Sequence, residues 1–154
     1  MEFQKKIYIF SGSELQVNDY PALEAKSLYS SEQFIKNALL AERMGINWLI
    51  LSDMHGLVWP ETMLAPYDKE CLQEAEKSMR LKRALQPDIV ANTVISALHL
   101  QCPRGLAISE WREKISQEYS FILIGEDDSI SDALTHLLSN GFLARRLNNL
   151  NLIN

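Results

Sequence analysis

The sequence has little of what secreted, membrane-spanning or metal-binding proteins require. Its two cysteines, Cys71 and Cys102, are far apart and lack the spacing of metal ligands. Its longest apolar runs are far too short to span a bilayer. The N-terminus shows no secretory signal. We therefore expect reduced thiols in a cytoplasmic protein without a membrane partner.

Positive charge is also scarce. The 154 residues include 15 Lys and Arg against 20 Asp and Glu, a formal net charge of −5. This balance argues against a dominant phosphate-binding surface and still allows a local basic patch. What is present is an ordinary globular composition, with 47% hydrophobic and 23% charged residues. The length predicts one domain, or at most two small ones.

The N-terminal third has the pattern of a strand, a helix and a second strand. Residues 6–10, KIYIF, are rich in strand-forming side chains. A helix is expected over about residues 32–45, with Ser30 or Ser31 as its cap and a glycine at its end. The run WLIL within residues 47–52 is typical of a parallel strand covered on both faces. These elements predict a right-handed βαβ unit.

The second half is expected to contain four helices and two further strands. The predicted helices span about residues 69–85, 89–100, 109–119 and 129–140, and the predicted strands span residues 121–124 and 142–153. Ser109 is the expected cap of the third of these helices, and Ser129 or Ser131 that of the fourth. Asn140–Gly141 is a typical signal for the end of a helix.

Two interpretations of the fold follow from this order. In the first, residues 1–154 form a single α/β domain, a three-layer Rossmann-like sandwich with a mostly parallel sheet of about four strands. In the second, residues 1–85 form an α/β half and residues 86–154 a winged helix, in which Arg145–Arg146 would contact nucleic acid. The apolar YSFILIG stands where a winged helix needs a tight turn, which favours the first interpretation.

The densest group of reactive side chains lies in residues 49–68, LILSDMHGLVWPETMLAPYD. Parallel sheets present ligand-binding groups just past the carboxyl ends of their strands, and this segment begins as a buried strand. Ser52 and His55 are the candidate catalytic residues, with His55 as a general acid or base. Residues this close in sequence rarely form a catalytic triad. In the alternative, Ser52 and Asp53 cap the strand end and His55 is merely exposed.

Further candidate ligand contacts come from other strand ends and from aromatic residues. The predicted ligand-binding residues are Ser11, Ser13, Tyr29, Asp53, Gly56, Tyr67, Asp68, Gly125 and Glu126. The turn of residues 11–13 is suited to hold an anion on its backbone N–H groups and hydroxyls, or is a simple turn. The two tyrosines either sandwich a planar ring or pack on the core. Asp68 either contacts a ribose or caps the next helix. No paired histidine spacing is present, and no metal site is predicted.

Two segments of the first half resemble an uncharacterised bacterial and phage family, domain of unknown function 6884. The matching residues are Pro21–Ala22, Leu28–Tyr29–Ser30, Phe34, Ile50–Leu51–Ser52, Gly56–Leu57, Pro60 and Pro66–Tyr67–Asp68. The resemblance implies that a helical insertion of about residues 80–105 separates them from a Trp-bearing helix and the FILIG strand. The first turn departs from the family, because it reads SGSELQ where Cys and Lys are usual.

The motif GL-x-x-P…PYD is also similar to a segment of archaeal enzymes that modify deazaguanine in transfer RNA. This similarity, with the polar strand ends, predicts binding of a nucleoside, nucleotide or deazapurine-like ligand and action on an N-glycosidic or related bond. One alternative is a non-catalytic phage or plasmid factor that targets a host protein. Another is a DNA-binding regulator that uses the winged helix. The cofactor, if any, is not readable from the residues.

Overall fold

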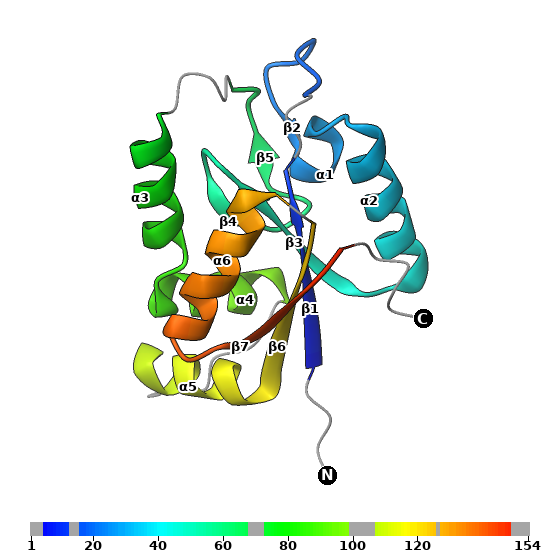
Figure 1. Cartoon of the computed structure of the whole chain (residues 1–154). Helices are drawn as coiled ribbons and strands as arrows, with labels where there is room; N and C mark the ends of the chain where they lie inside the picture. The colour runs from blue at the N-terminus through cyan, green and yellow to red at the C-terminus, as the bar shows by residue number, and fades with distance from the viewer. Residues whose placement is uncertain (1–4, 13–15, 68–72, 99–106, 126, 149–154) are drawn as a thin grey trace.

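The structure, a computed structural model, describes residues 5–12, 16–67, 73–98, 107–125 and 127–148. Within these residues five strands form one sheet in the order β4-β3-β1-β6-β7 (Figure 1). The strands are β1 (Lys5–Ser11), β3 (Asn47–Ser52), β4 (Gly56–Val58), β6 (Tyr119–Ile124) and β7 (Leu143–Leu147). All neighbours pair in parallel except β3 and β4. Strands β2 (Leu23–Glu24) and β5 (Met63–Leu64) pair antiparallel and form a separate two-stranded sheet.

Helices cover both faces of the sheet. The described helices are α1 (Ala25–Leu28), α2 (Glu32–Met44), α3 (Glu74–Ala84), α4 (Pro87–Ala97), α5 (Ile108–Glu118) and α6 (Asp128–Ser139). Helices α1 and α2 lie on one side and α3 to α6 on the other (Figure 1). The three-layer α/β class with a mostly parallel sheet is therefore confirmed, with one strand more than the four expected.

The alternation of side chains along β1 explains the two cores. Ile7 and Ile9 join the apolar cluster beneath α4, α5 and α6, whereas Tyr8 and Phe10 join the cluster beneath α1 and α2. All four side chains are at most 4% exposed. Burying such side chains on both faces stabilises a strand by about 1.5–3 kcal/mol for each residue. This double burial is why KIYIF forms a central strand.

The ends of several helices differ from the prediction. Helix α2 agrees, because Ser31 Oγ accepts the backbone N–H of Phe34 and Gly45 takes the left-handed conformation. Helix α5 begins before Ser109, and α6 begins before Ser129, so neither serine is a cap. Asp127 precedes α6 without a side-chain cap bond, and its Oδ2 accepts a hydrogen bond from Ser11 instead.

The C-terminal strands complete the sheet. Strand β6 lies between β1 and β7, with Tyr8 opposite Ile122 and Ile122 opposite Arg145. This pairing contradicts a separate winged helix over residues 86–154, so the nucleic-acid contact that depended on it loses its basis. The predicted insertion of about residues 80–105 contains α4 and the end of α3. Among the described residues, every helix is too short or too polar to cross a membrane.

Candidate functional site

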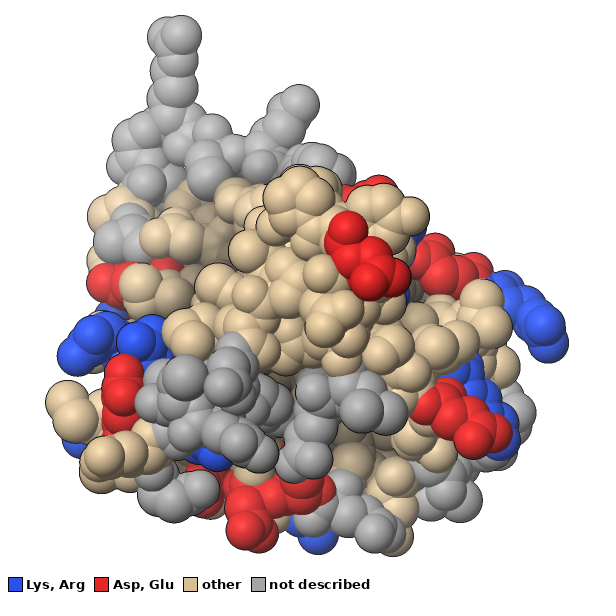
Figure 2. Space-filling view, turned by 90° about the horizontal axis from the view of Figure 1, so that it is seen from above, with Lys and Arg blue, Asp and Glu red and all other residues tan. Residues whose placement is uncertain are grey.

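The carboxyl ends of three parallel strands converge at one edge of the sheet. Ser11, at the end of β1, donates its Oγ–H to Oδ2 of Asp127 at 2.7 Å. Ser129 donates to Oδ1 of Asp53, which follows β3, at 3.3 Å. The start of α6 thus connects the ends of β1 and β3. Figure 2 looks onto this end of the molecule, where the coloured Lys and Arg side chains lie mainly toward the edges of the view.

A pocket of about 370 Å³ opens beside this junction, and we call it the α3–α6 pocket. Its lining is Ser52, Asp53, Ala75, Lys77, Ser78, Leu81, Asp128, Ser129 and Asp132. Among the described residues, three carboxylates, three hydroxyls and one ammonium group therefore surround it. Ser52 and Asp53 were predicted as site residues from their place after β3. The lining residues of α3 and α6 were not, because they become neighbours only when the two helices pack together.

In the described part of the turn after β1, two of the expected anion donors are engaged in hydrogen bonds within the protein. The backbone N–H of Gly12 donates to the carbonyl of Leu51 at 2.8 Å. The hydroxyl of Ser11 is bonded to a carboxylate, which already places negative charge beside the turn. Ser13 lies outside the described residues. In the described part of the turn these two donors are thus engaged within the protein, and anion binding by the turn stays a prediction.

Ser52 and His55 are connected by a hydrogen bond from the backbone of the histidine and not from its ring. The N–H of His55 donates to Ser52 Oγ at 3.1 Å, and that oxygen also shares a hydrogen bond of 3.0 Å with the Tyr67 hydroxyl. Ser52 is only 2% exposed. The His55 ring instead packs edge-on against the Tyr67 ring, with 5.4 Å between centroids. Burial, together with the charge of Arg80, lowers the pKa of His55 and favours its neutral form. Their catalytic role stays a prediction.

The two tyrosines contact each other directly, and their part in ligand binding stays a prediction. Their hydroxyls share a hydrogen bond of 2.7 Å, and the rings meet edge to face at 6.4 Å. Tyr29 is 1% exposed, and this burial raises its pKa well above the ordinary range. Tyr67 is half-buried, and its backbone N–H donates to Oε1 of Gln16 at 2.9 Å. Sequence reasoning missed this role of Gln16, since a bond across 51 positions leaves no local pattern.

The remaining predicted ligand residues are two glycines and two acidic residues. Gly56 is buried at the start of β4 with a φ of 78°. Gly125, with a φ of 141°, donates its N–H to the carbonyl of Leu147 at 3.0 Å. Asp68 and Glu126 lie outside the described residues. Among the His, Cys, Asp and Glu side chains that the structure describes, none form a group of three suited to a metal ion.

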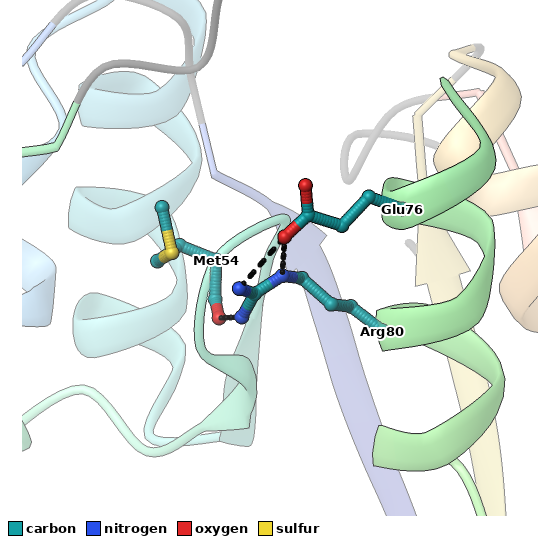
Figure 3. Close-up of polar contacts among 3 residues, drawn as sticks. All are labelled: Met54, Glu76 and Arg80. Carbon is teal, nitrogen blue, oxygen red and sulfur yellow. Dashed lines mark hydrogen bonds and ion pairs between the residues drawn. The ribbon is translucent and has the colours of Figure 1, made fainter. Parts of the chain in front are cut away.

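Arg80 ties the turn of residues 53–55 to α3 (Figure 3). Its Nη1 donates to the carbonyl of Met54 at 3.3 Å, and its Nε and Nη2 both donate to Oε1 of Glu76, at 3.2 and 3.0 Å. Because α3 supplies four lining residues to the α3–α6 pocket, this contact sets one wall of the pocket against the β3–β4 turn. The exposed Arg–Glu pair adds little stability by itself.

Arg80→Met is expected to raise the pKa of His55 toward its ordinary value of about 6.5, because the nearby positive charge is lost. A histidine with a lowered folded-state pKa makes the protein less stable as the pH falls below about 6.5. The variant should therefore lose less stability on acidification. An NMR titration of the His55 ring measures the shift. Arg112→Met is the control, since Arg112 is similarly exposed and is paired with Asp88. If the pKa of His55 shifts equally in this control, the effect of Arg80 is not local.

Comparison with known proteins identifies a family for this arrangement. Residues 7–122 match the "Family of unknown function (DUF6884)". The match runs from β1 through α5 into β6, beyond the first half that carried the resemblance. The comparisons with curated proteins and with solved structures gave no match. With three quarters of its residues covered by that match, the chain belongs to the family of unknown function DUF6884.

Proposed function

We propose that the protein binds a nucleoside, or a deazapurine-like analogue of one, in the α3–α6 pocket. The observation that carries the proposal is the polar lining of this pocket at the carboxyl end of β3. Ligands of open α/β sheets bind outside the carboxyl ends of the strands. An acidic side chain there often accepts hydrogen bonds from the hydroxyls of a ribose. The volume of about 370 Å³ falls within the ordinary range for small-molecule pockets.

The charge of the lining favours a nucleoside over a nucleotide. Among the described lining residues, Asp53, Asp128 and Asp132 supply three negative charges, against one positive charge from Lys77. A phosphate would bring further negative charge into this group, and like charges at short range repel. Hydroxyl donors, in contrast, find carboxylate acceptors there, and such charge-assisted hydrogen bonds are the strong ones.

The proposal extends to hydrolysis of an N-glycosidic bond. In such a reaction the C1′–N bond breaks, a water oxygen forms the new bond to C1′, and a proton from the water goes to the leaving base. Positive charge develops on the ribose as the bond breaks, as in other glycoside cleavage, and a nearby carboxylate stabilises it. The aspartates of the α3–α6 pocket are the groups that would supply this stabilisation.

Calorimetric titration with adenosine, guanosine, cytidine, uridine and 7-deazaguanosine tests the binding. We expect at least one nucleoside to bind, its 5′-monophosphate to bind more weakly, and Asp128→Asn to weaken binding about tenfold or more, since a hydrogen bond to a charged group contributes about 1.5–3 kcal/mol. Asp88→Asn is the matched control, because Asp88 also lies in the first turn of a helix and is outside the lining.

Two results would contradict the proposal. One is that no member of the panel binds at millimolar concentration. The other is that nucleoside and monophosphate bind equally and Asp128→Asn behaves like Asp88→Asn. Chromatography of the bound nucleoside after incubation tests the reaction separately, because hydrolysis releases the free base. Binding without release would retain the pocket assignment and reject the hydrolysis.

A further inference from the structure

A second pocket lies at the opposite end of the sheet, where β1 and β3 begin, and we call it the amino-end pocket. Its volume is about 170 Å³, and its lining includes Ile7 and Asn47 near the starts of those strands. Residues after β4 and the end of α4 close it. None of the described residues that line it belongs to the α3–α6 pocket. The two pockets are therefore separate features of the molecule.

The lining of the amino-end pocket combines an indole ring with carboxylates. Trp59 supplies the ring, and Glu42 and Glu61 supply the two acids. The ring of Trp48, another lining residue, packs against Phe10 and Phe34. No Lys or Arg belongs to the lining among the described residues. The remaining walls are mostly aliphatic, with Val94 and Leu98 among them. Aromatic faces attract cations through their quadrupoles, and the carboxylates add a direct charge attraction.

The chain itself supplies a cation at the rim of this pocket. Nζ of Lys26 lies 3.8 Å from Oε1 of Glu42, and the two side chains are 35% and 52% exposed. An ion pair this long and this exposed contributes little, so a bound cation can compete with it. The negative charge of the pocket is thus only loosely neutralised by the protein.

We propose that the amino-end pocket binds a small organic cation, an alkylammonium ion with an apolar body. A cavity of about 150 Å³ accommodates benzene in another protein, so a ligand of that size fits 170 Å³. The aliphatic walls receive the hydrocarbon part, while the Trp59 indole and the two glutamates receive the charge. This inference goes beyond the proposed nucleoside site, and its residues take no part there.

Titration with tetramethylammonium and butylammonium, followed by NMR of the tryptophan indole N–H signals, tests the inference. We expect the signals of Trp48 and Trp59 to shift with each cation and to shift far less with the neutral controls tert-butanol and 1-butanol. Trp59→Leu should weaken binding about 3- to 30-fold through the lost cation–π contact. Glu61→Gln, an exposed and conservative change, should weaken it by several fold and keeps the test open if Trp59→Leu does not fold.

The cation affinity of Lys26→Met shows whether the pocket residues form a binding site or only pack against one another. Removing the competing ammonium should strengthen cation binding, whereas a packing role would give no such gain. Asp128→Asn, in the α3–α6 pocket, should leave cation binding unchanged. The nucleoside proposal and the cation proposal can therefore fail independently. Three results would overturn the inference. Alcohols and cations bind equally, neither binds at 50 mM (about the limit of a specific test), or the cations bind Lys26→Met more weakly than the unchanged protein.

Discussion

Replacing Gly56 with alanine is expected to destabilise the protein strongly. The φ of Gly56 is +78°, a region that costs a residue with a side chain about 1–2 kcal/mol. A Cβ at this position would also lie 2.6 Å from the Cβ of Ala84, near the end of α3. Crowding of this kind costs about 1–3 kcal/mol more. Urea unfolding measures the total loss.

Two further variants separate the backbone cost from the crowding. Gly45→Ala has a similar φ of +66° with nothing within 4 Å of the added Cβ, so it reports the backbone cost alone. Gly56→Ala combined with Ala84→Gly removes the close contact and should recover the part due to crowding. If Gly56→Ala costs no more than Gly45→Ala, the close approach of β4 to α3 is wrong.

The same contact links Gly56 to the α3–α6 pocket. Helix α3 must move away from β4 to admit a methyl group, and α3 carries Lys77, Ser78 and Leu81 of the lining. Sequence reasoning placed Gly56 among the ligand-binding residues. That role stays a prediction. The structure adds that the missing side chain of Gly56 allows α3 to lie close to β4. A change in nucleoside affinity without direct contact is therefore expected in Gly56→Ala.

The elements that were predictable depend on local pattern and double-sided burial. Strand β3 begins and ends where the sequence indicated, since WLIL must be covered on both faces. Helix α2 was found from its apolar spacing, the Ser31 cap and the terminal Gly45. Each of these signals is contained within a few consecutive residues. Sequence alone therefore sufficed for the βαβ unit and for the edge of the sheet where the candidate site lies.

What was missed depends on contacts between distant segments. Strand β4 has only three residues, and its pairing with β3 rather than its composition makes it a strand. The lining of the α3–α6 pocket brings Ser52, Ser78 and Asp128 together from three different elements. Asp127 acts as an acceptor for Ser11 across 116 positions, which no local motif records. The end of the sheet where the α3–α6 pocket lies was thus predictable, and most of the residues that line this pocket were not.

Gly12→Ala is the second substitution with a large expected effect. The added Cβ would lie 2.7 Å from Cζ and 2.8 Å from Cε1 of Tyr29. That ring is 1% exposed and is held by the hydrogen bond between the Tyr29 and Tyr67 hydroxyls, so it cannot swing into solvent. Overpacking of a closed core costs about 1–3 kcal/mol. Thermal and urea unfolding should both report the loss.

A double-mutant cycle identifies the ring of Tyr29 as the cause. Tyr29→Leu removes the ring, so Gly12→Ala should be much less costly in that background, with a coupling energy of about 0.5–3 kcal/mol. Tyr29→Phe retains the ring and loses only the hydroxyl, so the cost of Gly12→Ala should persist there. Additive costs in all three backgrounds would show that Tyr29 does not pack on Gly12 as described.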